Sequence, residues 1–335
     1  MLTIIEDGSE IRRCQGKFEL ALKKLLGKKV EGFVGHMGAT REATLNWSRK
    51  LGLWAVFDRA DGSRFWNAFG LEEPKKGALR SILAEINFPF KGVDRRVAGV
   101  FVKGEDEKIF VCHSGRIGGG RLGIGKRLFK DNYRGQEVTV SDGKREEEFA
   151  LIGDVNSPRF PYQVREFVLE VNRIKKIGTG EIEKIEPRKK SGFTPEFSGK
   201  RRFKLSREVV SNCDHGYVVG ELARLLGAKN LTIGNDRSRD LYILDKERNI
   251  LALFEVKTDV STGSLYSGVG QLLINSLQEE SKPRLILVIP KKLVSGMEEG
   301  LKSIGIECLT YKLGERDVNF KNLKELKLFE QGEEK

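Results

Sequence analysis

The second half of the chain alternates between two apolar patterns. Apolar residues recur at helical spacing over Tyr217–Leu226, Leu265–Leu277 and Lys292–Ile304. Short continuous apolar runs, which are typical of buried strands, lie around these helices. The predicted strands are Leu231–Ile233, Leu241–Leu244, Ile250–Lys257, Leu285–Pro290 and Cys308–Tyr311. The order helix, three strands, helix, strand, helix, strand predicts an α/β domain in which helices flank a mixed sheet.

The first half has a less regular pattern, in which short apolar strands alternate with glycine-rich turns. The predicted strands are Trp54–Phe57, Leu83–Ile86, Val97–Val102, Lys108–Cys112 and Val138–Val140. One helix is predicted over Pro161–Ile174, where apolar residues recur every three or four positions. These elements indicate an α+β domain with a curved or barrel-like sheet.

A polar stretch separates the two halves. Residues 175–204 hold ten Lys and Arg against four Glu, with Gly, Pro and Ser scattered among them and no sustained apolar period. Such a composition suits an exposed linker. We therefore predict two domains, 1–175 and 206–335, joined by a basic linker over 176–205.

The charge of the chain is unevenly distributed. Its 335 residues include 60 Lys and Arg against 48 Asp and Glu, a net charge of +12. Residues 1–174 contain 31 basic and 24 acidic side chains, whereas residues 206–335 contain 19 and 20. The positive surplus belongs to the first domain and the linker, so we expect that part of the chain to bind a polyanion such as nucleic acid.

Two absences in the sequence narrow the class of protein. No apolar run approaches the ~18 residues that a membrane-spanning helix needs. The cysteines are far apart and form neither a disulfide framework nor a zinc-binding pattern. They are Cys14, Cys112, Cys213 and Cys308. We expect a cytoplasmic protein that has no membrane partner.

The strongest candidate for chemistry is an acidic motif in the second domain. Fourteen residues separate Asp240 from Glu255, which begins the tripeptide Glu255-Val256-Lys257. Alternate residues of a strand share a face, so Glu255 and Lys257 project together, and a hairpin can bring Asp240 beside them. Two carboxylates and the Val256 carbonyl are hard oxygen ligands for Mg²⁺, with Mn²⁺ as an alternative. Lys257 could then orient or help deprotonate a water that attacks a phosphodiester.

This motif resembles that of the PD-(D/E)XK nuclease superfamily, with Asp240 as the first acid and Glu255-Val256-Lys257 as the second element. Glu221 matches an accessory acid on the preceding helix, and Gln271 matches a glutamine on the following helix. The resemblance covers residues 206–315. It implies catalysis by these residues, with the metal held by Asp240, Glu255 and Val256.

Three other aspartates compete for the position of the first acid. Asp245 lies in the predicted hairpin turn, where Asp is a favoured turn residue, and Asp259 is expected to end the strand. Asp236 is the nearest rival, because the loop before the strand could place either it or Asp240. We favour Asp240, which directly adjoins an apolar strand. The alternative for the whole motif is a surface hairpin with an ordinary Glu–Lys pair.

Residues 112–127 of the first domain combine glycines with basic side chains. A near-match to a P-loop ends at Lys126, but Arg127 replaces the Ser or Thr that would bind Mg²⁺, so an ATPase is rejected. Here glycines would let backbone amides approach DNA phosphates while basic side chains supply charge. The expected DNA-binding side chains are Arg116, Arg121, Lys126 and Arg127. A flexible loop with solvated charges is the alternative.

A second segment of the first domain begins at Ser157. Phe160, Pro161 and Val164 lie at a predicted helix start, where they could line a small apolar notch. With the preceding glycine-rich segment, these residues resemble the sulfur-binding domain of phosphorothioate-dependent type IV restriction endonucleases over roughly residues 60–175. The resemblance implies that the three residues receive a backbone sulfur and that His113 and Ser114 lie in the same pocket. Core packing at the helix start is the alternative.

Together these patterns predict a two-domain, Mg²⁺-dependent DNA endonuclease. Its N-terminal α+β domain would recognise double-stranded DNA, with phosphorothioate linkages as the modification that it reads. Its C-terminal α/β domain would hydrolyse phosphodiesters, and family resemblance implies a homodimer that cuts both strands. The alternatives are a type II restriction endonuclease that reads an unmodified sequence and a catalytically silent DNA-binding regulator.

Overall fold

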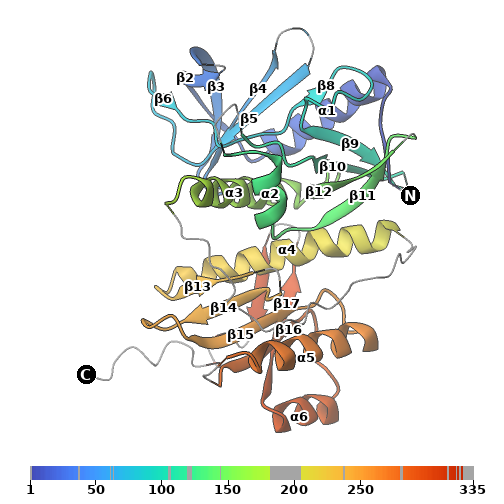
Figure 1. The fold of residues 1–335 in the computed structure, drawn as a ribbon, viewed down its shortest axis with the longest axis vertical. Helices are drawn as coiled ribbons and strands as arrows, with labels where there is room; N and C mark the ends of the chain where they lie inside the picture. Colours follow the sequence, from blue (N-terminus) through green and yellow to red (C-terminus); the bar gives the residue numbers. More distant parts are fainter. Residues whose placement is uncertain are drawn as a thin grey trace. The chain divides into compact units, whose positions relative to one another are not determined.

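The computed structural model separates the chain into two compact units, Met1–Cys213 and Asp214–Lys335 (Figure 1). The described residues are 2–36, 38–60, 62, 64–104, 107–118, 123–143, 145–181, 205–236, 238–279, 282–314, 317–321, 323 and 326; residues 36, 60, 205–213 and 295 are described by their backbone alone. Most of the predicted linker, residues 182–204, lies outside these ranges. Its first residues belong to the end of a helix.

The first unit contains a closed five-stranded barrel. Its strands are β1 (Leu2–Ile4), β9 (Gly99–Lys103), β10 (Ile109–His113), β11 (Glu137–Ser141) and β12 (Glu146–Asp154). The order around the barrel is β1-β11-β12-β10-β9, and β1 pairs antiparallel with β9 to close it. Because alternate residues of a strand face inward, Leu2, Val102, Phe110 and Val140 form part of its core.

A second, seven-stranded sheet belongs to the same unit. Its long strands are β2 (Lys28–His36), β3 (Ala39–Ser48), β4 (Leu53–Ala60) and β5 (Arg64–Gly70), and its short ones are β6 (Leu79–Arg80), β7 (Ala84–Glu85) and β8 (Phe88–Pro89). The long strands form an antiparallel meander. Trp47, Trp54 and Trp66 are buried in its core.

Three helices of the first unit are α1 (Gly8–Lys23), α2 (Lys126–Asn132) and α3 (Phe160–Gly178). Asp7 caps α1 by accepting the backbone amides of Ser9 and Glu10. Helix α3 packs against the barrel strand β12. Phe18 of α1 meets Phe160 of α3 edge to face, with ring centroids 5.6 Å apart, so aromatic packing fixes the two helices together.

The predictions for the first half are confirmed in part. Four predicted strands correspond to β4, β9, β10 and β11, the fifth contains β7, the helix is α3, and the barrel-like sheet is present. Helix α1 was missed because its buried face includes the polar Gln15 and the small Cys14, which weaken the apolar period. Strands β2 and β3 were missed because β2 begins with two exposed lysines and the first six residues of β3 are exposed or half-buried and mostly polar.

The second unit is built on a six-stranded mixed sheet in the order β13-β14-β15-β16-β17-β18. The strands are β13 (Thr232–Gly234), β14 (Leu241–Leu244), β15 (Ile250–Val256), β16 (Arg284–Ile289), β17 (Ile306–Leu313) and β18 (Val318–Lys321). Strands β15, β16 and β17 are parallel, and the outer pairs are antiparallel. The predicted order of elements is confirmed, with β18 as an addition that was not predicted.

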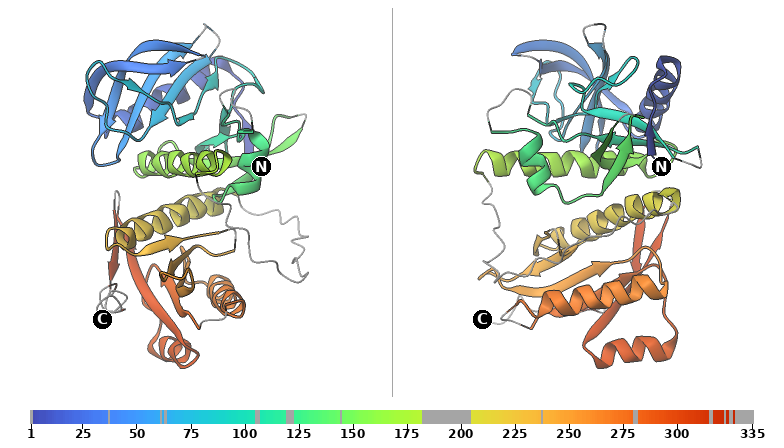
Figure 2. Two further views of the ribbon diagram at one scale, coloured as in Figure 1. Left: turned by 60° about the vertical axis from the view of Figure 1, so that its left-hand side comes forward. Right: turned by 45° about the vertical axis from the view of Figure 1, so that its right-hand side comes forward.

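Three helices accompany this sheet, α4 (Leu205–Gly227), α5 (Thr262–Ser276) and α6 (Ser295–Ser303). Helix α5 packs on β15 and β16, and α6 packs on β17. Figure 2 shows α4 and α5 on opposite faces of the sheet. Val218 and Leu222 of α4 are fully buried, so this helix presents its apolar stripe to the core. None of the helices in the described part of the chain combines the length and apolar character needed to cross a membrane.

Candidate functional site

The hairpin of β14 and β15 determines where the predicted acids lie. Leu241 pairs with Phe254, so Asp240 stands opposite Glu255 in the next position of the same antiparallel ladder. Directly opposed residues lie on the same face of a sheet, which brings the two carboxylates together. Asp245 closes the hairpin by accepting the backbone amides of Glu247 and Asn249, in the turn role expected for it.

Lys257 is held by two partners at the end of β15. Its Nζ donates to Glu255 Oε1 at 2.6 Å and to Gln271 Oε1 on α5 at 2.8 Å. Ser267, one turn earlier on α5, also donates to Gln271 Oε1 at 2.9 Å. The structure therefore joins three of the predicted site residues in one hydrogen-bonded chain.

Asp240 is anchored from two directions through one oxygen. Its Oδ2 accepts the backbone amide of Val256 at 2.8 Å and Nε2–H of His215 at 3.0 Å. Burial pushes the pKa of Asp240 up, but the hydrogen bond and charge of His215 outweigh it, and the pKa is lowered. In turn the pKa of His215 is raised, because its bond to Asp240 outweighs its own burial. No described residue bonds to Asp240 Oδ1.

Glu255 is the most buried member of the group, with 2% of its side chain exposed. Burial and the nearby charge of Asp240 raise the pKa of Glu255 to about 7, although Lys257 opposes the rise. A buried ion pair of this kind adds little to stability compared with apolar residues of similar size. The charges of Glu255 and Lys257 are therefore better explained by chemistry than by packing.

The rival aspartates are engaged elsewhere. Asp236 accepts both the amide and the hydroxyl of Ser238 and lies 3.6 Å from the Arg239 guanidinium. Asp259 accepts the amide of Ser261 just before α5. Each of these acids therefore organises its own loop, and Asp240 is the one that contacts the strand end carrying Glu255 and Lys257.

Glu221 is not joined to this cluster in the structure. It pairs with Arg224 one turn later on α4, at 3.0 Å, and contacts neither carboxylate nor Lys257 among the recorded bonds of the described residues. The α4 residue that does reach the cluster is His215, which was not among the site residues predicted from the sequence. Its spacing of three and seven from the buried Val218 and Leu222 places it on the core-facing stripe, and that spacing could have revealed it.

The apolar residues predicted to bind sulfur lie in the core of the first unit. Phe160 and Val164 are fully buried, and Pro161 is buried beside them in the first turn of α3. The predicted notch is therefore not exposed to a DNA strand in this structure. These residues therefore pack in the core, which was the alternative interpretation, and the ring of Phe160 lies against that of Phe18.

His113 is also buried, with 1% exposed. Its Nε2–H donates to the Glu85 carbonyl at 3.2 Å, its Nδ1 accepts the Gly115 amide at 3.0 Å, and its ring lies 4.9 Å from that of Phe167. Burial lowers the pKa of His113 to about 4, and the bond to Glu85 only partly opposes this. The neutral ring thus orders the chain after β10 and is not presented to a ligand.

The remaining predicted DNA-binding residues fall into three groups. Ser114, Arg116 and Lys126 line a cavity in the first unit. Arg127 is almost fully exposed, and its nearest acid, Asp131, is 3.9 Å away. Arg121 lies outside the described residues. The structure therefore places Arg116 and Lys126 at one cavity with Ser114. The predicted apolar residues, Phe160, Pro161 and Val164, do not line that cavity.

No group of three or more His, Cys, Asp and Glu side chains arranged to hold a metal is found among the described residues. The cluster around Asp240 and Glu255 offers two carboxylates and a main-chain carbonyl. None of the family models, curated proteins or solved structures compared with the chain matches it.

Proposed function

We propose that the second unit is a PD-(D/E)XK-type phosphodiesterase and that the protein is a Mg²⁺-dependent DNA endonuclease. The observation that carries this proposal is the placement of Lys257. Its ammonium group is held by Glu255 and Gln271 at the strand end where Asp240 also lies. Two carboxylates and a lysine are thus gathered where β14 begins and β15 ends, an arrangement that can hold a metal ion and orient water for hydrolysis of a phosphodiester.

The donor set suits a hard divalent cation. Glu255 Oε2 and Asp240 Oδ1 make no recorded hydrogen bond to described residues, and both are carboxylate oxygens, which Mg²⁺ prefers. Asp240, Glu255 and the carbonyl of Val256 would hold the ion. When bound, it supplies positive charge that stabilises the phosphate oxygens during attack.

The residues of the chain perform the other tasks. His215 and the Val256 amide fix the Asp240 carboxylate, so that Oδ2 is occupied and Oδ1 is left to face a ligand. Gln271 fixes the ammonium of Lys257, which can donate a hydrogen bond to the attacking water or to a phosphate oxygen. Glu221 has no assigned part, because it is paired with Arg224.

We assign recognition of double-stranded DNA to the first unit, on the strength of its positive charge and its exposed Arg116 and Arg127. A phosphorothioate requirement remains part of the proposal, although the buried Phe160 and Val164 offer no support for it. A homodimer is proposed because one such site cuts one strand at a time.

The test is cleavage of matched plasmids, with and without phosphorothioate linkages, by the full-length protein in Mg²⁺. Lys257→Ala and Asp240→Ala are expected to lower the cleavage rate by at least about 10²-fold while DNA binding is retained. The matched controls are Lys246→Ala, an exposed lysine of the hairpin turn, and Asp236→Ala in the neighbouring loop. Cleavage that survives in Lys257→Ala, or a wild type that binds but never nicks DNA in Mg²⁺ or Mn²⁺, would refute the assignment. Cleavage of both plasmids at equal rates would favour an enzyme that reads unmodified DNA.

A further inference from the structure

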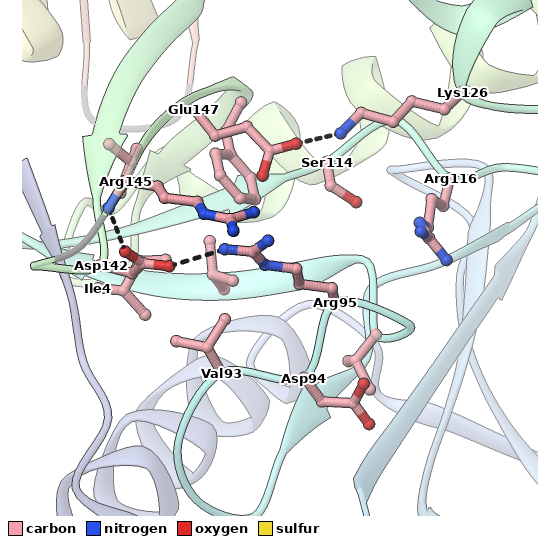
Figure 3. A pocket seen from close by; sticks show the side chains of 14 residues that line it. Ile4, Val93, Asp94, Arg95, Ser114, Arg116, Lys126, Asp142, Arg145 and Glu147 are labelled. Atoms are coloured by element: carbon pink, nitrogen blue, oxygen red, sulfur yellow. Dashed lines mark hydrogen bonds and ion pairs between the residues drawn. The ribbon is translucent and has the colours of Figure 1, made fainter.

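A cavity of about 150 Å³ opens in the first unit, between the barrel strands and the segments that follow β8 and β10. Its apolar wall consists of Ile4, Val93, Val97, Val100, Val140 and Phe149. Its polar side carries Arg95, Arg116, Lys126 and Arg145 (Figure 3). A cavity of this volume holds a molecule about the size of benzene, so it can admit one small group.

The acids that line the cavity are already paired. Asp142 accepts the Arg95 guanidinium at 3.1 Å and the backbone amide of Arg145 at 2.7 Å. Glu147 pairs with Lys126, and Asp94 bonds to Arg96, which does not line the cavity. Each of these acids is therefore already bonded to basic or amide groups of the protein when no ligand is present.

Two of the arginines, Arg116 and Arg145, are exposed, and their guanidinium groups make no ion pair with a described residue. Figure 3 shows the guanidinium groups of Arg95 and Arg145 facing each other in the middle of the cavity. Asp142 already neutralises Arg95, so Arg145 brings the surplus positive charge to this part of the cavity.

Ser114 supplies an independent sign of a ligand. Its side chain lines the cavity, the residue is 9% exposed, and its hydroxyl is buried without a hydrogen-bond partner. Buried hydroxyls are normally satisfied, so this one has bonding capacity that a molecule in the cavity can use. Figure 3 shows Ser114 between the Arg95–Arg145 pair and Arg116.

We propose that this cavity binds a phosphoryl group through Arg95, Arg145 and the Ser114 hydroxyl. Guanidinium groups match the geometry and charge of phosphate, and a serine hydroxyl can donate to a third oxygen. The phosphoryl group belongs either to a free nucleoside monophosphate or to the end of a DNA strand. This site is independent of the proposed nuclease centre, which lies in the other unit.

The test is calorimetric titration of the full-length protein, in EDTA, with inorganic phosphate and with thymidine 5′-monophosphate. Arg145→Gln is expected to weaken phosphate binding at least about tenfold, because a charge-assisted hydrogen bond is lost. Ser114→Ala should weaken it about threefold to tenfold without lowering the melting temperature, because the hydroxyl it removes is unsatisfied in the free protein. The matched control is Arg49→Gln, an exposed arginine of the first unit away from the cavity.

Two further ligands identify the source of the phosphate. Duplexes of the same sequence, with 5′-phosphate or 5′-hydroxyl ends, are compared in wild type and Arg145→Gln. Tighter binding of the phosphorylated duplex that depends on Arg145 assigns the site to DNA ends, and binding of the monophosphate alone assigns it to free nucleotides. Absence of phosphate binding in the wild type, or equal losses in Arg145→Gln and Arg49→Gln, would overturn the proposal.

Discussion

Two regions of the molecule place polar side chains directly after a buried strand, and they differ in how those side chains are satisfied. After β15, Lys257 bonds to Glu255 and Gln271 within the second unit. At the end of β10, His113 is bonded inside the first unit, but the next residue, Ser114, carries a buried hydroxyl with no partner among the described residues. The ammonium group of Lys257 thus has its partners within the second unit, whereas the Ser114 hydroxyl leaves bonding capacity unused.

The histidines of the two regions show the same contrast. His113 is buried without an acid beside it, and burial lowers its pKa to about 4. His215 bonds to the Asp240 carboxylate, which outweighs burial and raises its pKa. One imidazole is therefore a neutral part of the core, and the other is electrostatically coupled to the site. Burial alone therefore does not decide the protonation of a histidine; its hydrogen-bond partner does.

The largest effect is expected for Phe160→Ala. Removing a fully buried ring that packs on Phe18 should lower the free energy of unfolding of the first unit by about 3–5 kcal/mol. Urea titration measures this loss. Leu20→Ala, which truncates a side chain of α1 that is 61% exposed, should change stability by less than about 0.5 kcal/mol. A Phe160→Ala protein with unchanged stability and lost DNA binding would show that Phe160 belongs to a DNA-recognition surface.

The second expected effect concerns His113 and pH. The unfolded chain protonates this ring below about pH 6.5, whereas the folded chain does so only below about pH 4. The contribution of His113 to the free energy of unfolding is therefore fully present above pH 6.5 and is lost as the pH falls towards 4. The loss attributable to this residue is about 3 kcal/mol over that window. Urea titrations of wild type and His113→Gln between pH 7 and pH 4 measure it. Parallel stability curves for the two proteins would show that the ring titrates normally in the fold.

The third expected effect concerns the anchor of Asp240. His215→Ala leaves the Val256 amide as the remaining recorded bond to Asp240, and it should raise the Mg²⁺ concentration for half-maximal cleavage by about tenfold to 100-fold. The comparison variant is Glu221→Ala, which removes an acid paired with Arg224 and should change that concentration less than His215→Ala does. A larger effect for Glu221→Ala would restore the accessory role that family resemblance gives it.

The regions also differ in how far the sequence could predict them. The cluster after β15 follows from local rules, because strand periodicity sets Glu255 and Lys257 on one face and hairpin register sets Asp240 opposite Glu255. Gln271 could be placed because α5 follows directly and must pack back on the sheet. His215 was missed because the predicted helix began at Tyr217, although its spacing from Val218 and Leu222 places it on the core-facing stripe of α4.

The first unit was less predictable for the same physical reason. Phe160, Pro161 and Val164 at a helix start suit an exposed notch and a buried core equally well in sequence, and only Phe18 of the unpredicted α1 decides between them. The cavity near Ser114 joins barrel strands with residues that are distant in sequence, such as Arg95 and Arg145. Its composition depends on barrel closure, which periodicity alone does not specify.

The smallest expected effect tests how tightly Lys257 is positioned. A Cβ at Gly268 of α5 would lie 2.7 Å from Leu287 Cδ1 and 3.1 Å from Lys257 Cε, whereas a Cβ at Gly270 would meet nothing within 4 Å. Gly270→Ala should stabilise the helix by about 0.5–1 kcal/mol and leave cleavage unchanged. Gly268→Ala gains the same helix propensity but displaces flexible side-chain ends, so we expect little net change in stability and a cleavage rate lowered a few-fold. Thermal melts and plasmid cleavage of this matched pair measure both quantities. Equal cleavage by the two variants would show that the reaction tolerates movement of the lysine, and that the contacts holding it matter less than its presence.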